Sequence, residues 1–227
     1  SIHSFPTRRS SDLRIKANSK LYDVTRIDHF RGFESYWQVP YGEETAINGE
    51  WVKGPAMKLF NVIKKELGDV DIIAEDLGYL TDEVRKFRED SGYPGMKVLE
   101  FAFDAREESD YLPHNYDKDY VVYTGTHDND TVNGWFENAN KSDVDFAIKY
   151  LKLTKEEGYN WGFIRGALSS VASLAIAQFQ DYLGLGTEAR MNIPSTLGGN
   201  WRWRAKKKDI NGDLSKKICE ITKLYGR

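Results

Sequence analysis

Three acidic residues, Asp28, Glu75 and Asp128, each stand at or just past the end of a segment with the pattern of a buried strand. Sugar transfer through a transition state that resembles an oxocarbenium ion requires a nucleophilic carboxylate, an acid that donates a proton, and further negative charge nearby. The three side chains could supply these functions if one fold brought the three strand ends together. Their types and positions therefore point to chemistry on glycosidic bonds.

Basic and imidazole side chains accompany two of these acids. Arg26 precedes Asp28 by two residues, and side chains two apart lie on the same face of a strand, so the guanidinium could hold the carboxylate ionised and oriented. His29 and His127 adjoin Asp28 and Asp128. A neutral imidazole can hydrogen-bond a sugar hydroxyl without adding charge.

A structural reading of the same residues stands beside the chemical one. The chain holds 35 aspartates and glutamates, so acids near strand ends also arise by chance. In this reading Arg26 and Asp28 form an ion pair, and the stretch THDND at 126–130 is a capped turn before a helix. Spacing alone does not choose between the two readings.

Strand and helix patterns alternate along most of the chain, which predicts parallel strands joined by helices. The predicted strands cover residues 22–28, 70–78, 96–104, 119–130 and, with helix as the alternative, part of 171–181. The predicted helices cover residues 55–67, 81–90, 131–138, 142–152 and 158–170. Acids at the ends of several strands favour a (β/α)8 TIM barrel, in which catalytic residues come from the C-terminal ends of the strands. At most five of the eight strands are recognisable, so we expect a partial barrel.

Composition excludes several classes of protein. A net charge of −3 argues against nucleic acid as a partner, and no run approaches the ~18 apolar residues that a membrane span needs. The single cysteine, Cys219, excludes a disulfide framework and a multi-cysteine zinc site, which favours a cytoplasmic location. We expect Cys219 to be a small buried residue of the last helix. Residues 1–13 lack periodicity and are expected to be a non-native or disordered lead-in to one domain over 14–227.

Seven motifs in order resemble the amylomaltase or disproportionating-enzyme family of 4-α-glucanotransferases, glycoside hydrolase family 77. They are RIDHFRGFESYWQVPYGEETAINGEWVKGP (26–55), IIAEDLG (72–78), PGMKVLEFAFD (94–104), YTGTHDNDT (123–131), QDYLGLG (180–186), ARMNIPST (189–196) and NWRWR (200–204). The chain resembles only the C-terminal part of such enzymes, from about the fourth barrel strand onward. The resemblance thus implies about strands 4 to 8 of a TIM barrel, with a missing N-terminal half that a complete site would need.

The resemblance also implies a function and roles for single residues. The implied reaction transfers α-1,4-glucan segments between maltooligosaccharides or starch- and glycogen-derived glucans by a retaining double displacement, without a metal or organic cofactor. Asp28 matches the nucleophile, Glu75 the general acid/base, and Asp128 the aspartate that stabilises the transition state. Five further positions match residues that contact sugar or lie near the bond that is cut: Arg26, His29, His127, Phe101 and Asn192.

Two other functions remain open at this point. An α-amylase-type hydrolase would use a similar Asp, Glu and Asp on a barrel, and a truncated fragment could bind glucan without turning it over. Asp104 is expected to be structural or at a distal subsite. Packing is the favoured role for the tryptophans Trp37, Trp51, Trp201 and Trp203.

Overall fold

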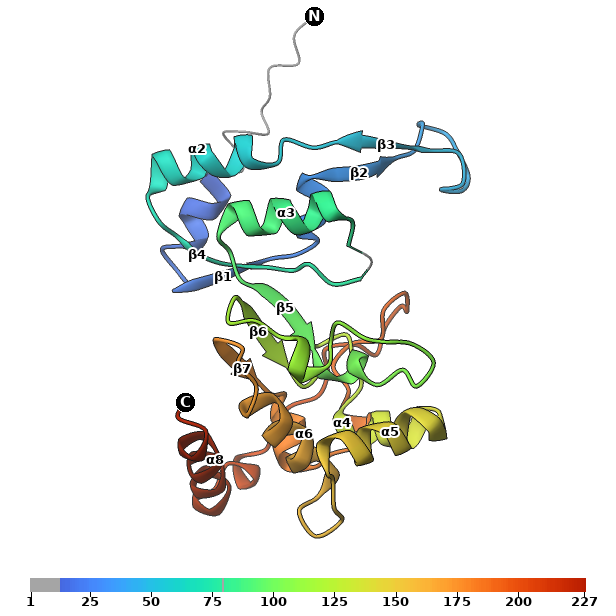
Figure 1. The fold of residues 1–227 in the computed structure, drawn as a ribbon, viewed down its shortest axis with the longest axis vertical. Helices are drawn as coiled ribbons and strands as arrows, with labels where there is room; N and C mark the ends of the chain where they lie inside the picture. Colours follow the sequence, from blue (N-terminus) through green and yellow to red (C-terminus); the bar gives the residue numbers. More distant parts are fainter. Residues whose placement is uncertain (1–12, 79) are drawn as a thin grey trace, which may run out of the picture. The chain divides into compact units, whose positions relative to one another are not determined.

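A computed structural model describes residues 13–78 and 80–227 (Figure 1). The chain is an α/β protein and divides into two compact units, one ending at Met96 and one spanning Lys97–Arg227, which are described separately. The expected lead-in lies outside the described residues except for Leu13, which begins a helical stretch over 13–18. None of the helices in the described part combines the length and apolar character that a membrane span requires.

Two parallel strands form the centre of the first unit. They are β1 (Val24–Ile27) and β4 (Asp71–Ala74), paired in register from Val24 opposite Asp71 to Ile27 opposite Ala74. Both lie within predicted strand segments, so these strands are confirmed, although only four residues of each segment are extended. The ends of β1 and β4 are therefore side by side, as the positions of the acids suggested.

Two helices of the first unit pack on these strands. They are α2 (Met57–Leu67) and α3 (Asp82–Ser91). The Thr81 hydroxyl accepts a hydrogen bond from the Val84 N–H and so caps α3, and α2 ends at Gly68, whose φ of 76° suits a residue without a side chain. Both helices were predicted within two residues of these bounds.

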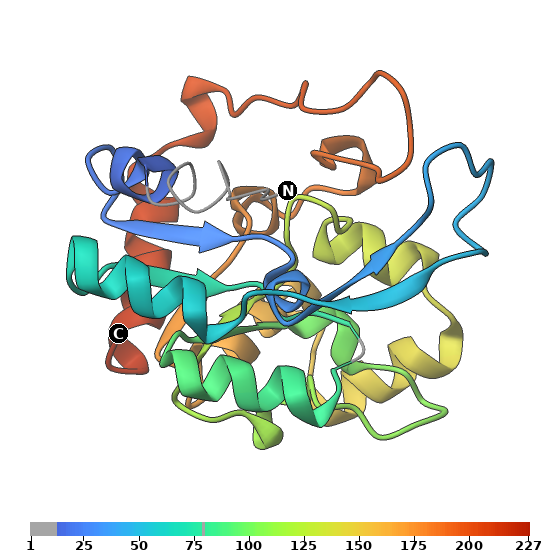
Figure 2. The ribbon, with the colours of Figure 1, turned by 90° about the horizontal axis from the view of Figure 1, so that it is seen from above.

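An antiparallel hairpin in the first unit was not predicted. It consists of β2 (Ser35–Gln38) and β3 (Glu50–Lys53), and in Figures 1 and 2 it reaches away from the helices of its unit. Trp37 and Trp51 face each other across the two strands with ring centroids 5.6 Å apart, a pairing that stabilises an antiparallel ladder. Most hairpin residues are exposed. The sequence therefore did not show the alternation of apolar and polar residues that marks a half-buried strand.

An aromatic cluster under the helices anchors the chain just after β1. Phe30 begins a short 3-10 helix (Phe30–Phe33) and is completely buried. Its ring stacks on Phe87 at 4.6 Å and lies 5.1 Å from Phe60, so it joins α2 and α3 to the segment that follows Asp28. The packing of Phe30 therefore helps to set where Asp28 and His29 stand.

Phe30→Ala is expected to lower the free energy of unfolding by about 3–5 kcal/mol, because it removes a fully buried ring and leaves a cavity. Phe30→Leu should cost clearly less, and Tyr41→Ala, at a fully exposed hairpin position, should stay within about 0.5 kcal/mol of the parent. Urea unfolding followed by tryptophan fluorescence measures these differences. A Phe30→Ala loss no larger than that of Tyr41→Ala would contradict the packing role.

A three-stranded sheet lies against helices in the second unit (Figure 1). Its order is β5 (Gly95–Val98), β6 (Tyr120–Tyr123) and β7 (Leu174–Ile176), with β6 and β7 parallel. The helices are α4 (Val132–Asn138), α5 (Lys141–Leu151), α6 (Tyr159–Leu168), α7 (Phe179–Leu183) and α8 (Gly212–Leu224). Further 3-10 helices occur at Leu99–Ala102, Pro113–Asn115, Thr187–Ala189 and Lys207–Asp209. The helices predicted near 131–138, 142–152 and 158–170 are confirmed.

Two predicted strands of this unit end early, the one over 96–104 and the one over 119–130, of which only Tyr120–Tyr123 is extended, so that Asp128 lies in the turn after β6. The strand expected over 96–104 stops at Val98 and becomes a 3-10 helix, in which Leu99, Glu100 and Ala102 are buried while Phe101 is half exposed. That burial pattern does not alternate as an extended strand would. The strand predicted within 171–181, with helix as the alternative, is confirmed as β7, and α7 begins at Phe179 of the same segment.

Cys219 is exposed on α8, so the expectation that it is buried is wrong. The apolar stripe of α8 is formed by Leu214, Ile218 and Ile221, which pack against a core group containing Ile164 of α6. Cys219 follows Ile218 directly and so points about 100° away from that stripe.

Candidate active site

The first unit places Asp28 and Glu75 at neighbouring strand ends. Each is the residue directly after the last paired residues of β1 and β4, Ile27 and Ala74. The pairing continues beyond the strands, because the Glu75 N–H donates to the Ile27 carbonyl and the Phe30 N–H donates to the Glu75 carbonyl, both at 2.9 Å. Two acids far apart in sequence are therefore held at adjacent backbone positions.

Backbone N–H groups orient the Glu75 carboxylate. Its Oε2 accepts the His29 N–H at 2.6 Å, and its Oε1 accepts the Leu77 N–H at 2.9 Å. One of the two donors comes from the residue that follows Asp28. The Glu75 side chain is thus tied to the Asp28 strand as well as to its own.

Arg26 pairs with Asp28 as the strand geometry predicted. Its Nη2 lies 2.7 Å from Asp28 Oδ1, and its Nε donates to the Met96 sulfur at 3.2 Å. The Arg26 side chain is 30% exposed, whereas that of Asp28 is 77% exposed. The ion pair suits both sequence readings, and the exposed side of the Asp28 carboxylate leaves it accessible to a substrate.

His29 adopts a left-handed backbone conformation, with φ 49° and ψ 50°. A non-glycine residue in this region is uncommon and is often found where function requires a particular chain direction. The conformation turns the chain from Asp28 into the buried Phe30 and aims the His29 N–H at Glu75. Gly32 leaves room for the imidazole, because a Cβ there would stand 2.8 Å from His29 Cδ2.

The second unit brings together His127, Asp128 and Asn192. Asn192 Nδ2 donates to Asp128 Oδ1 at 2.5 Å, and the Asn192 N–H donates to the His127 carbonyl at 3.1 Å. His127 Nε2 lies 3.5 Å from Asp128 Oδ2, and Arg190 donates to the Asp128 carbonyl at 2.6 Å. Three residues that the sequence marked as candidates therefore contact one another.

The turn that carries these residues also satisfies the structural reading. The Thr131 hydroxyl accepts from the Gly134 N–H and caps α4, while Asn129 Oδ1 accepts from the Thr126 N–H and hydroxyl. The Asp128 N–H donates to the Thr126 hydroxyl at 3.3 Å, but the Asp128 side chain takes part in none of these bonds and is 49% exposed. The helix cap thus accounts for the turn but not for the Asp128 side chain.

A sequence model of the 4-alpha-glucanotransferase family, glycoside hydrolase family 77, matches residues 12–209. The chain belongs to this 4-alpha-glucanotransferase family. This confirms the resemblance that the seven motifs indicated.

Relatives from several organisms are similar over nearly the whole chain. The 4-alpha-glucanotransferase of Clostridium butyricum is 60% identical over 215 residues, which are 94% of this chain and 44% of that protein. The one from Synechocystis is 52% identical over 216 residues, 94% of this chain and 43% of that protein. An amylomaltase of Streptococcus agalactiae, solved in complex with acarbose, superposes with a TM-score of 0.91 at 38% identity over 100% of this chain and 47% of its own. The chain thus spans less than half the length of these relatives.

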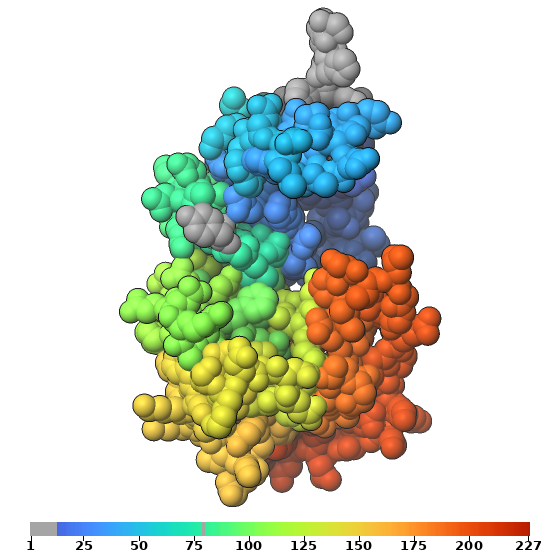
Figure 3. Space-filling model, turned by 90° about the vertical axis from the view of Figure 1, so that its right-hand side faces the viewer, coloured from blue at the N-terminus to red at the C-terminus, as the bar shows by residue number. Residues whose placement is uncertain are grey.

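Two exposed aromatic rings lie in the second unit, one at the candidate residue Phe101 and one at Trp201. Phe101 is 46% exposed in the 3-10 helix after β5, with its ring edge-on to Tyr111 at 5.6 Å. Trp201, for which packing was the favoured role, lies with its ring 5.0 Å from that of His127 and is 52% exposed. It belongs to residues 190–204, orange on the face shown in Figure 3. Only the fold reveals that Trp201 adjoins His127, because the two residues are 74 positions apart in the sequence.

Sequence reasoning missed two buried acids of this family member, Glu100 and Asp181. Burial and, to a smaller extent, the neighbouring charge of Asp130 together raise the pKa of Asp181 to about 6, against hydrogen bonds from Thr124 and Val132 that lower it. Burial also raises the pKa of Glu100 well above its usual value, with the charges of Asp181 and Asp130 acting in the same direction. Glu100 stands within the apolar stretch VLEFAF (98–103), which is a signal that could have marked it, whereas Asp181 follows directly on Gln180 and has no such signal.

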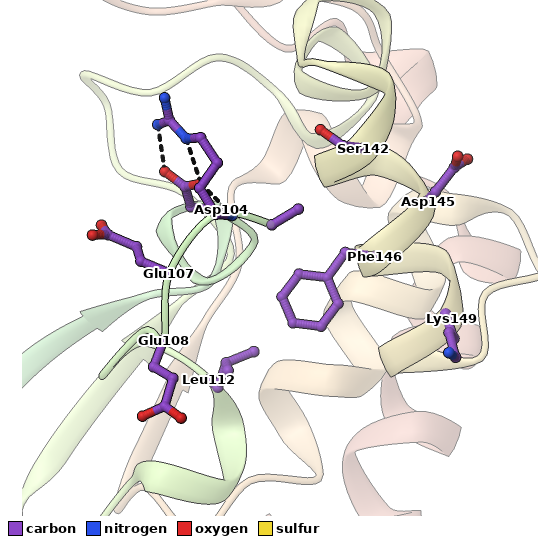
Figure 4. A pocket seen from close by; sticks show the side chains of 10 residues that line it. Asp104, Glu107, Glu108, Leu112, Ser142, Asp145, Phe146 and Lys149 are labelled. Atoms are coloured by element: carbon purple, nitrogen blue, oxygen red, sulfur yellow. Dashed lines mark hydrogen bonds and ion pairs between the residues drawn. The ribbon is translucent and has the colours of Figure 1, made fainter.

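Asp104 lies apart from these residues, in an open hollow of about 620 Å³ (Figure 4). The Arg106 guanidinium donates to it from Nε at 2.8 Å and from Nη2 at 2.6 Å, and these hydrogen bonds lower the pKa of Asp104 to about 2. Phe146 lines the opposite side. None of the predicted site residues lines this hollow, which fits a structural role for Asp104.

Within residues 13–78 and 80–227, no group of three His, Cys, Asp or Glu side chains is arranged to hold a metal ion.

Proposed function

We propose that residues 14–227 act in a 4-α-glucanotransferase, as about strands 4 to 8 of a (β/α)8 TIM barrel. The observation that carries the proposal is the placement of Asp28 and Glu75 at adjacent ends of parallel strands, with the Glu75 carboxylate bonded to the His29 N–H. Family membership supports the same activity. The substrates proposed are maltooligosaccharides and longer α-1,4-glucans, and the location proposed is the cytoplasm.

The spacing of the two strands favours a retaining reaction. Neighbouring strands lie about 4.8 Å apart. Retaining glycosidases hold their two carboxyl groups about 5–5.5 Å apart, whereas inverting enzymes need about 6.5–9.5 Å to admit a water. Residues that start from adjacent positions of paired strands suit the shorter separation.

In the first step, an Asp28 oxygen attacks the anomeric carbon of the donor glucan. The bond from that carbon to the glycosidic oxygen breaks, and its electron pair stays on the oxygen, which takes a proton from the Glu75 carboxyl group. One glucan segment leaves with a free 4-hydroxyl, and the other remains as a glycosyl ester of Asp28. Arg26 holds the free Asp28 carboxylate ready for this attack.

In the second step, the 4-hydroxyl of an acceptor glucan attacks the anomeric carbon of the ester. Glu75, now a carboxylate, takes the hydroxyl proton, and the bond to Asp28 breaks, so that both residues return to their starting states. Two inversions at one carbon retain its configuration. Transfer exceeds hydrolysis when an acceptor sugar reaches the ester more readily than water does.

Asp128 is proposed to stabilise the positive charge that develops on the sugar ring. Its bonds to Asn192 and Arg190 hold it in place, since one fixes a carboxylate oxygen and the other fixes the backbone carbonyl. His29 and His127 are proposed to hydrogen-bond sugar hydroxyls, and Phe101 to contact the sugar near the bond that is cut.

The activity is testable with a chimera, in which residues 14–227 replace the matching part of the Clostridium butyricum relative. Incubation with maltotriose is expected to yield glucose together with a ladder of longer oligosaccharides, resolved by chromatography. Reducing ends that rise without longer products would instead establish a hydrolase. We expect the 227 residues alone to be inactive, because the rest of the barrel is proposed to complete the site; disproportionation by the isolated chain would refute that part.

A further inference from the structure

Asp181 holds both ends of the turn that carries His127 and Asp128. We propose that Asp181 is a positioning residue, which sets the place of Asp128 by clamping the segment from Thr124 to Val132. The proposal rests on the proposed function for its catalytic consequence. Its structural content rests on hydrogen bonds within the second unit.

The clamp consists of one carboxylate and two donors. The Thr124 hydroxyl, directly after β6, donates to Asp181 Oδ2 at 2.6 Å. The Val132 N–H, in the first turn of α4, donates to Asp181 Oδ1 at 2.8 Å. The two donors bracket seven residues, with Asp128 in the middle. A single side chain from α7 therefore closes the turn at its base.

Other bonds hold the clamp itself in place. Asn160 of α6 donates to the Asp181 carbonyl at 2.7 Å and so fixes its backbone. Gln178 Nε2 donates to the Asp130 carbonyl at 3.0 Å, and the Thr187 hydroxyl donates to Asp130 Oδ2 at 2.8 Å. The residues on either side of Asp181 in sequence thus bind the same turn.

The burial of the Asp181 carboxylate indicates that it positions the turn and does not stabilise the fold. Asp181 is 1% exposed and Thr124 is fully buried, and taking a carboxylate out of water costs free energy that hydrogen bonds only offset. Two acids, Glu100 and Asp130, lie close enough to oppose a further negative charge. An apolar residue would avoid these costs, but it could not accept from Thr124 and Val132.

The chemistry of the clamp selects aspartate over its amide. A carboxylate can accept at both oxygens, whereas asparagine has one acceptor oxygen and an NH2 group that would face one of the two donors. An NH2 group opposite the Val132 N–H would push the start of α4 away. An NH2 group opposite Thr124 would require its hydroxyl to turn round and lose the bond that it now donates.

Thr124→Val tests the clamp, because it keeps the shape of the buried side chain and removes the hydroxyl, which donates to Asp181 and accepts from the Gln178 N–H at 3.4 Å. In the chimera, kcat for maltotriose disproportionation is expected to fall about 10- to 100-fold, the scale of a small misplacement of a reacting group. KM should change little, since Asp128 is proposed to act in the transition state. Thr124→Ser, which restores the hydroxyl, should return kcat close to that of the parent.

Amide hydrogen exchange in the same proteins gives a readout that needs no activity. The amides of residues 126–132 should exchange faster in Thr124→Val and in Asp181→Asn, while those of α6 stay unchanged. Thr222→Val is the matched control, because Thr222 is a half-buried residue of the same unit whose hydroxyl donates to Ile218 at 2.7 Å, outside the turn. It should leave both kcat and the exchange of 126–132 as in the parent.

The outcomes separate this inference from the proposed function. If the parent chimera forms no product longer than maltotriose, the proposed function is refuted. The exchange data would still decide whether Asp181 holds the turn. An active parent with undiminished kcat in Thr124→Val and Asp181→Asn would overturn the positioning role, even if both variants melt at lower temperature. Unchanged exchange over 126–132 would overturn the clamp itself.

Discussion

Asp28→Asn is expected to abolish glucan transfer by the chimera, with kcat lowered about 10⁴-fold or more, as is typical when a nucleophile is removed. An amide oxygen is a far weaker nucleophile than a carboxylate, so the glycosyl ester cannot form at a useful rate. The substitution keeps the size of the side chain, and Asp28 is largely exposed, so the fold should be retained. The measurement is maltotriose disproportionation, together with mass spectrometry of protein trapped with a slow donor.

The control for Asp28→Asn is Asp90→Asn on α3. Asp90 is also an exposed aspartate of the first unit paired with a basic side chain, Lys86 at 2.9 Å. Loss of an exposed ion pair changes stability by less than about 1 kcal/mol, so activity should be that of the parent. If Asp28→Asn kept ordinary turnover, or still formed a covalent adduct at residue 28, the nucleophile assignment would be wrong.

Glu75→Gln is expected to lower kcat for maltooligosaccharides about 10²- to 10⁴-fold, the range that general acid catalysis contributes. Glutamine cannot donate a proton to the glycosidic oxygen, so the leaving glucan would depart as a poor leaving group. The fluoride ion of a glucosyl fluoride donor leaves without protonation. The rate at which this donor forms the glycosyl ester should therefore change little. Burst kinetics of fluoride release compared with maltotriose turnover measures this contrast.

The contrast between donors separates chemistry from geometry. Glutamine can accept only one of the two N–H bonds that Glu75 receives, so part of any loss could come from a displaced side chain. A displaced side chain at position 75 would slow the reaction of both donors alike, whereas loss of the acidic proton would slow only the reaction of the glucan donor. Equal losses with glucan and fluoride would therefore argue against Glu75 as the acid. Glu89→Gln, at an exposed position of α3, should behave as the parent with both donors.

The candidate acids could be located from sequence because the signal is local. A short apolar run that ends in an acid predicts a strand with that acid at its carboxyl end, and Asp28 and Glu75 indeed follow β1 and β4. The pairing of Arg26 with Asp28 follows from the two-residue period of a strand, and it is present at 2.7 Å. The motifs also identified the family correctly.

Local signals failed where the chain departs from regular periods. The hairpin β2–β3 exposes most of its residues to solvent, so its sequence shows no alternation of apolar and polar residues. The run 96–104 has the composition of a strand, although Leu99–Ala102 form a 3-10 helix. Cys219 was misplaced because its small apolar character suggested burial, while the stripe of α8 is set by Leu214, Ile218 and Ile221. In each case, neighbours distant in sequence decided the outcome.

The sequence by itself determined which residues carry the candidate chemistry, the α/β alternation and the family, because residue types, periodicity and motif order are properties of the chain. Only the tertiary structure decided what those residues touch. That the His29 N–H binds Glu75, that Asn192 binds Asp128, and that Asp181 closes the turn from Thr124 to Val132 depend on atoms that are 46, 64 and 57 residues apart. Such contacts arise from the packing of strands and helices, and no local pattern in the sequence encodes their distances.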